Sequence, residues 1–304
     1  MWTRAPRLKV GLALLALALS LAGCGAARDP YGQQVKQVHD LARQGEAWFA
    51  QGEWRRAQRD FNRALDLSRA VDYPTGAAQQ LNNLGAVALE QCDLPQAREL
   101  FQQALAINRE RRQWAEACTN LANLATVAQK AGDWPQAEDY LRQAMDAAEK
   151  SLSPAALAQV RCRWAGLAID HQDYAMALAS LEAAQSLAKG PELQGMVQYQ
   201  WGRLALAQGD AAMARQHFQQ ALAADRQTLN RAAMAADLFS LGETYAQVQD
   251  WPQAFEFFSR AFGVYASLGK TAQLKECLKR LDEANRQGRL GRSLKSFETH
   301  PRLL

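Results

Sequence analysis

One pattern of small and large residues occurs six times along the chain. In each copy a Gly or Ala is followed twelve residues later by Ala, then four residues later by Phe or Leu, then three residues later by Ala. The step between copies is 40 residues, except for one step of 37 from Ala165 to Gly202. The first column is Gly45, Gly85, Ala125, Ala165, Gly202 and Gly242, and the third is Phe61, Phe101, Leu141, Leu181, Phe218 and Phe258. Chance periodicity within single helices does not keep such columns in register through every copy.

A fixed period of this length, built from small and large residues at set offsets, predicts a helical solenoid. The small residues let two helices cross closely, and the Phe or Leu fills the space between them. One helical hairpin cannot bury its own apolar face, so successive hairpins must stack on one another. We therefore expect an all-α, right-handed superhelical solenoid of six helix–turn–helix repeats with a C-terminal capping helix.

The order of residues within each copy resembles the tetratricopeptide repeat. The resemblance is clearest over Gln80–Ala104, and it covers roughly residues 38–269. The 40-residue step and the sequence LNNLG at Leu81–Gly85 resemble the longer variant found in kinesin-light-chain-like proteins. The resemblance implies a concave groove, lined by the first helix of each repeat, that binds a protein or peptide partner.

An acid follows a turn residue at the middle of every repeat. An Asp at such a position can cap the following helix, because its carboxylate accepts hydrogen bonds from exposed backbone N–H groups. We interpret these acids as helix caps and not as catalytic carboxylates. They are Glu53, Asp93, Asp133, Asp173, Asp210 and Asp250.

The amino terminus predicts a bacterial lipoprotein signal peptide over residues 1–23. A basic flank precedes the apolar run Val10–Leu21, which is shorter than the roughly 20 residues that a membrane-spanning helix needs. The sequence LAGC at Leu21–Cys24 resembles a lipobox, which implies cleavage before Cys24 and lipidation of its thiol. An ordinary secretory signal is the alternative. Gly25 in place of Asp implies forwarding to the outer membrane, where we expect the protein to face the periplasm.

We expect four further segments after the signal peptide: a lipidated tether at 24–34, the repeat solenoid at 35–270, a capping helix at 271–286 and a disordered basic tail at 287–304. The formal net charge of +4 falls to +1 once Arg4, Arg7 and Lys9 are removed. A nearly neutral chain gives no general case for binding nucleic acid.

The sequence indicates no enzyme, no cofactor and no metal site. No nucleophile, phosphate-binding or metalloprotease motif occurs, and no Cys and His stand at ligand spacing. The remaining cysteines are expected to be free and mostly buried. They are Cys92, Cys118, Cys162 and Cys277.

The candidate binding residues lie on the first helices. Asn83 and Asn123 match asparagines that contact the backbone of an extended peptide in kinesin-light-chain-like repeats, and an amide can donate and accept at once. Arg43 and Arg163 could hold a carboxylate. Further residues expected to face the groove are Tyr199, Arg203, Phe239 and Glu243. The alternative is that these side chains bond one another across repeats or face water.

These features predict a membrane-anchored envelope adaptor that binds an extended or helical segment of a protein partner. Two alternatives are an assembly factor for a pilus or secretion pore and a docking regulator of peptidoglycan hydrolases. The sequence specifies neither the partner nor the oligomeric state.

Overall fold

The structure, a computed structural model, describes residues 29–303. The predicted signal peptide, Cys24 and the first residues of the predicted tether lie outside this range. Within it the chain forms helices and no strands. The helices are α2 (Pro30–Ala50), α3 (Trp54–Ala70), α4 (Pro74–Glu90), α5 (Leu94–Glu110), α6 (Trp114–Lys130), α7 (Trp134–Lys150), α8 (Pro154–Asp170), α9 (Tyr174–Leu187), α10 (Pro191–Ala207), α11 (Ala211–Gln227), α12 (Arg231–Gln247), α13 (Trp251–Ser267), α14 (Thr271–Gln287) and α15 (Lys295–Glu298).

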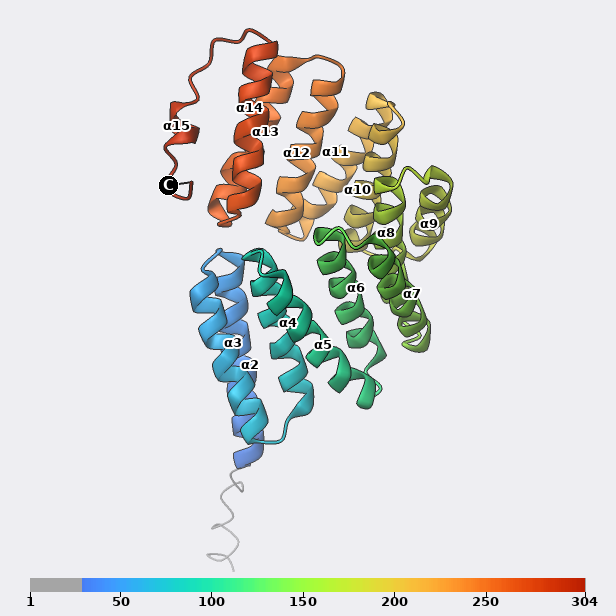
Figure 1. Cartoon of the computed structure of the whole chain (residues 1–304), viewed down its shortest axis with the longest axis vertical. Helices are drawn as coiled ribbons and strands as arrows, with labels where there is room; N and C mark the ends of the chain where they lie inside the picture. Colours follow the sequence, from blue (N-terminus) through green and yellow to red (C-terminus); the bar gives the residue numbers. More distant parts are fainter. Residues whose placement is uncertain (1–28, 304) are drawn as a thin grey trace, which may run out of the picture.

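Consecutive helices from α2 to α13 pack as six hairpins, and α14 covers the last one (Figure 1). The first helices of neighbouring hairpins also contact each other: α2 contacts α4, and α6 contacts α8. Within the described chain, neighbouring second helices do not contact each other as extensively. The first helices therefore lie on the inner side of the curve. The predicted all-α solenoid with a capping helix is confirmed.

The predicted caps form in five of the six turns within hairpins. Each Asp side chain accepts from the backbone N–H three residues later, at 2.9 to 3.3 Å. Glu53 makes no such bond, so the prediction of a side-chain cap is wrong there. The residue before each acid has positive φ, from 61° at Cys92 to 85° at Gly209. The five capping acids are Asp93, Asp133, Asp173, Asp210 and Asp250.

The small and large columns share one volume inside each hairpin. A Cβ on Gly85 would lie 2.6 Å from Cε1 of Phe101, and Gly45, Gly202 and Gly242 are equally close to the Phe of their own hairpins. Where the small column is Ala, the large column is Leu, as in the pair Ala125 and Leu141. The crossing therefore accepts either Gly with Phe or Ala with Leu.

We predict that Gly85→Ala destabilises the protein by about 1–3 kcal/mol, because the added methyl group overpacks the crossing. Adding Phe101→Leu should recover part of this loss, since the third and fourth hairpins already use that combination. Urea unfolding of wild type, both single variants and the double variant would measure the coupling between the two sites. Strictly additive effects would contradict the shared volume.

The 37-residue step coincides with a local change in the stack. Helix α9 has 14 residues where the other second helices have 17, and it ends before a linker in which Gly190 has φ of 82°. Helices α8 and α10 contact each other more extensively than any other neighbouring first helices. The missing residues thus draw the fourth and fifth hairpins together on the inner side.

The superhelix curves far enough for the turn between α2 and α3 to contact the turn between α13 and α14 (Figure 1). A Cβ on Gly52 would lie 2.3 Å from the carbonyl oxygen of Leu268, so the two turns are in backbone contact. Lys270 Nζ lies 2.5 Å from Glu90 Oε1 and 5.8 Å from the centre of the Trp54 ring. We call this group of contacts the closure.

Both ends of the described chain differ from the predicted segments. Helix α2 starts at Pro30, inside the predicted tether, because Asp29 caps it by accepting from Gly32 N at 2.9 Å. The predicted disordered tail contains α15 and packs on α13. The ring centre of Phe297 lies 5.1 Å from that of Phe262, which gives the tail an apolar anchor.

The four cysteines of the described chain are unpaired, as predicted, and three of them are buried. Burial raises the pKa of Cys118 to about 11 and that of Cys162 and Cys277 to about 12, so these thiols stay protonated at neutral pH. No helix within residues 29–303 has the length and apolar character needed to cross a bilayer.

Candidate functional site

The inner face, formed by α2, α4, α6, α8, α10 and α12, carries the predicted binding residues. Asn123 Nδ2 donates to Asn82 Oδ1 at 3.0 Å, which joins α6 to α4. Asn83 Nδ2 lies 3.5 Å from Gln80 Oε1 in its own helix. Both asparagines are half-buried, and among residues 29–303 neither carbonyl oxygen accepts a hydrogen bond from a side chain.

Two of the predicted arginines also link neighbouring repeats. Arg163 Nη1 donates to Thr126 Oγ1 at 3.0 Å, and the residue is exposed on the inner face. Arg203 Nη2 lies 2.5 Å from Asp170 Oδ1. Arg43 instead pairs with an acid of its own helix, Asp40.

The remaining predicted residues lie on the last two hairpins. Glu243 Oε1 accepts from Arg280 Nη2 of α14 at 3.2 Å. Tyr199 and Phe239 pack on the large columns of their hairpins, with ring centres 5.7 Å from Phe218 and 5.2 Å from Phe258. The structure therefore realises the alternative of bonds across repeats for Asn123, Arg163, Arg203 and Glu243, and contact with a ligand stays a prediction for all eight residues.

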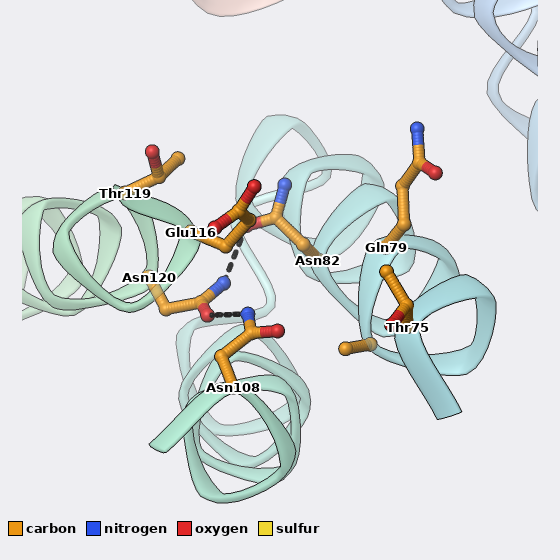
Figure 2. Close-up of a pocket in the computed structure, with 8 residues that line it drawn as sticks. Thr75, Gln79, Asn82, Asn108, Glu116, Thr119 and Asn120 are labelled. Carbon is orange, nitrogen blue, oxygen red and sulfur yellow. Dashed lines mark hydrogen bonds between the residues drawn. The ribbon is translucent and has the colours of Figure 1, made fainter. Parts of the chain in front are cut away.

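A cavity of about 270 Å³ opens between α4 and α6, and Figure 2 shows its polar lining. Asn108 Nδ2 donates to Asn120 Oδ1 at 2.7 Å, and Asn120 Nδ2 donates to Asn82 Oδ1 at 3.0 Å. Three helices thus contribute to one chain of amides. We call this the asparagine cavity, lined by Thr75, Ala78, Gln79, Asn82, Asn108, Glu116, Thr119 and Asn120.

A second cavity, of about 210 Å³, occupies the equivalent place between α10 and α12. Asp225 stands where Asn108 stands in the earlier hairpin, and Asp237 stands where Asn120 stands. Both acids are buried, Asp225 at 3% exposure and Asp237 at 0%. We call this the acidic cavity, lined by Glu192, Gly195, Met196, Tyr199, Asp225, Asn230, Ala233, Ala236 and Asp237.

Sequence reasoning missed the two acids of this cavity. The column four residues after the last Ala of each copy reads Ser68, Asn108, Ala148, Ala188, Asp225 and Tyr265. The column five residues before the next Gly or Ala reads Gln80, Asn120, Val160, Val197, Asp237 and, in the capping helix, Cys277. Comparing these two columns shows that two acids face each other at one junction between neighbouring hairpins, the fifth and the sixth.

The acidic cavity has unusual electrostatics. Burial, the nearby charge of Asp225 and a hydrogen bond between the two carboxyls together raise the pKa of Asp237 from 3.8 to about 9. Burial and the charge of Glu192 also raise the pKa of Asp225. Tyr199 and Tyr265 face the same region and are likewise disfavoured as anions, since burial raises both of their pKa values. Asp237 therefore holds a proton at neutral pH.

We predict that Asp237→Asn flattens the dependence of stability on pH. A group whose pKa is raised on folding contributes stability that is present below its unfolded value of 3.8 and is lost as the pH rises through about 9. The wild type should therefore lose stability relative to the variant across this range, by up to about 1.4 kcal/mol per pH unit. Urea unfolding at several pH values would measure the difference.

The exposed acid Asp146 on α7 supplies the control, because Asp146→Asn should leave the pH dependence of the wild type in place. Parallel stability curves for wild type and Asp237→Asn would show that Asp237 is ionised in the folded protein.

The described residues contain no group of three His, Cys, Asp or Glu side chains placed to hold a metal ion. The two cavities thus offer hydrogen-bonding amides and carboxylic acids. Such groups suit recognition of polar or charged parts of an organic ligand.

Comparison with known proteins gives a consistent result for the fold. One sequence model of the tetratricopeptide repeat matches residues 39–110 and 193–267, and a second matches residues 114–155. A search of curated proteins found no match to this sequence.

Several solved structures share the fold. The apo form of RapI superimposes with a TM-score of 0.60 at 13% identity, over 94% of each chain. A Rap protein complexed with Competence and Sporulation Factor gives 0.57 at 16% identity, over 87% of this chain and 88% of that one. BtubC (BKLC) from P. vanneervenii gives 0.50 at 18% identity, over 77% of this chain and 92% of that one. At these identities the likeness concerns the fold alone.

Proposed function

Since this chain belongs to the tetratricopeptide repeat family, we propose that it is an adaptor of the bacterial cell envelope that holds a segment of a protein partner on its inner face. The observation that carries the proposal is the row of amides on α4 and α6, which keep hydrogen-bonding capacity beside the asparagine cavity. No reaction is part of the proposal.

A peptide backbone presents N–H donors and C=O acceptors in alternation, and an Asn side chain can satisfy both kinds of group. The carbonyl oxygens of Asn83 and Asn123 are available as acceptors, and the bond from Asn123 to Asn82 fixes the position of one amide before a ligand arrives. A preorganised amide loses less side-chain entropy on binding than a mobile one.

The curvature of the stack favours a long, narrow ligand. Solenoids present an extended concave surface made of equivalent helices, so a segment can run across several repeats. The Rap structure with Competence and Sporulation Factor supports this use of the fold at the level of architecture, because a protein of this shape was solved with a bound factor.

We predict that Asn83→Ala/Asn123→Ala reduces recovery of the partner from envelope extracts by about tenfold, because two backbone hydrogen bonds of about 0.5–1.5 kcal/mol each are lost. Affinity capture followed by quantitative mass spectrometry would measure it. Gln103→Ala, an exposed amide on the second helix α5, is the matched control and should recover the partner as wild type does. Equal recovery by the wild type and the double variant would refute the assignment of the groove.

Membrane attachment is a separate part of the proposal and is supported by the sequence Leu21–Cys24. Acyl chains on Cys24 would anchor the protein, since each buried methylene contributes about 0.8 kcal/mol. An anchor of this kind raises the effective concentration of a captured partner at the membrane.

Cys24→Ser should therefore move the protein from the membrane fraction to the soluble fraction of cell extracts. Fractionation with immunoblotting would show the shift, and metabolic labelling with a fatty acid analogue should label the wild type alone. The exposed thiol Cys92 provides the control, because Cys92→Ser should change neither result. A variant that stays in the membrane fraction and keeps its label would exclude the lipid anchor at Cys24.

A further inference from the structure

The acidic cavity differs from every other junction in carrying two carboxylic acids. At the junction of the second and third hairpins the same positions hold Asn108 and Asn120, which satisfy each other with a hydrogen bond of 2.7 Å. Two later junctions hold only Ala and Val there. Packing of the solenoid therefore does not require acids at these positions, and a neutral pair of nearly the same size already serves in this chain.

The two acids act on each other and lack the basic partner that a buried carboxylate usually has. Protonated Asp237 has the carboxylate of Asp225 as its partner, and no N–H donor reaches either oxygen of Asp237, although the side chain is fully buried. Among the described residues no basic side chain forms an ion pair with either acid, and another acid, Glu192, helps to raise the pKa of Asp225. Two buried acids without a cation are costly to ionise together, so the cavity has unused capacity for a positively charged donor.

The lining of the cavity leaves room for a ligand next to the acids. Gly195 stands where the asparagine cavity has Ala78, and a Cβ at Gly195 would lie 2.8 Å from Asp225 Oδ1. The glycine therefore lets the carboxylate of Asp225 reach the cavity side of α10. Met196, Ala233 and Ala236 add apolar surface around the opening.

We propose that the acidic cavity binds an alkylammonium or guanidinium group, supplied by a lysine or arginine side chain of the segment held on the inner face. The charged end donates to Asp225 and Asp237, and the aliphatic stem lies against Met196, Ala233 and Ala236. Glu192 at the exposed start of α10 adds negative charge at the entrance. The source of the cation rests on the function proposed above, whereas the site itself does not.

The chemistry of the pair favours an organic cation. A cation in the cavity lowers the cost of ionising both acids, so Asp237 releases its proton as the ligand enters. Charge-assisted hydrogen bonds to carboxylates are about twice as strong as neutral ones. The described residues offer no set of three ligands placed for a metal ion, and a cavity of about 210 Å³ suits a side chain better than a bare ion.

The position of the cavity connects it to the inner face. Tyr199 lines the acidic cavity and also a neighbouring hollow of about 370 Å³ that includes Arg203 and Glu243. A segment lying along α10 and α12 could therefore place one basic side chain between these helices without leaving the face. This continuity favours a side chain of a bound protein over a free amine.

Calorimetric titration of the full chain with blocked amino acids would test the proposal. The probes are N-acetyl-lysine N-methylamide, N-acetyl-arginine N-methylamide and, as the uncharged isostere, N-acetyl-norleucine N-methylamide. We expect the wild type to bind the charged probes at least about tenfold more tightly than the isostere, as a charge-assisted hydrogen bond in a buried site implies. n-Butylammonium and Mg²⁺ are titrated as two further probes.

The matched variant is Asp225→Asn/Asp237→Asn, which copies the pair Asn108 and Asn120 and is therefore expected to fold. It should lose the preference for the charged probes, and circular dichroism should show unchanged helix content. Glu192→Gln should weaken binding of the charged probes only modestly, because Glu192 lies at the exposed rim.

Several results would overturn the proposal: no preference of the wild type for charged probes, the same preference in the double variant, or tighter binding of Mg²⁺ through both acids. Binding of n-butylammonium without binding of the blocked lysine would assign the cavity to a free amine and exclude the side chain. If the titrations contradict the cation site while partner capture still depends on Asn83 and Asn123, the proposed function remains in place. If the titrations support the cation site while partner capture does not depend on Asn83 and Asn123, the proposed function is refuted and the cation site remains.

Discussion

The close crossing of two helices inside each hairpin is the interaction on which this structure depends. Gly85 and Phe101 show its form: a residue without a side chain on the first helix gives the ring of the second helix its space. Six such crossings set the distance between paired helices, and the distance in turn sets how the next hairpin stacks. The inner face, its row of amides and both cavities exist because this one packing solution recurs with a nearly constant step.

The sequence was sufficient to predict features that depend on neighbours in the chain or on the repeat. The hairpins, the turns and caps such as Asp93 follow from local propensity and from the columns. Glu53 failed as a side-chain cap although it occupies the same column, since a glutamate side chain is one methylene longer. Features that arise from accumulated geometry were not predictable: the contact of Lys270 with Glu90 depends on the small rotation that each hairpin adds. Phe297, which anchors the tail, is a single aromatic residue without any periodic signal.

The same distinction applies to the candidate site. The columns placed Asn83 and Asn123 on the first helices, but the bond from Asn123 to Asn82 depends on the register between neighbouring helices, which no single repeat specifies. Asp225 and Asp237 lie in columns that face the next hairpin, so the pattern of residues that face the groove does not indicate them. A repeat protein supplies its own comparison, because six copies show what packing alone requires. A residue that differs from the others in its column without a packing reason, as these acids do, indicates a requirement other than packing.

The closure between Gly52 and Leu268 has a consequence for how the chain can vary. Each repeat of an ordinary solenoid touches only its neighbours, so copies can be gained or lost without disturbing the remainder. In this protein the loss of one 40-residue copy would leave the α13–α14 turn one hairpin short of the α2–α3 turn, and an added copy would carry it past. A solenoid can in general have any number of repeats, whereas in this protein the number of repeats must let the two ends meet. The number of repeats is therefore itself under structural constraint.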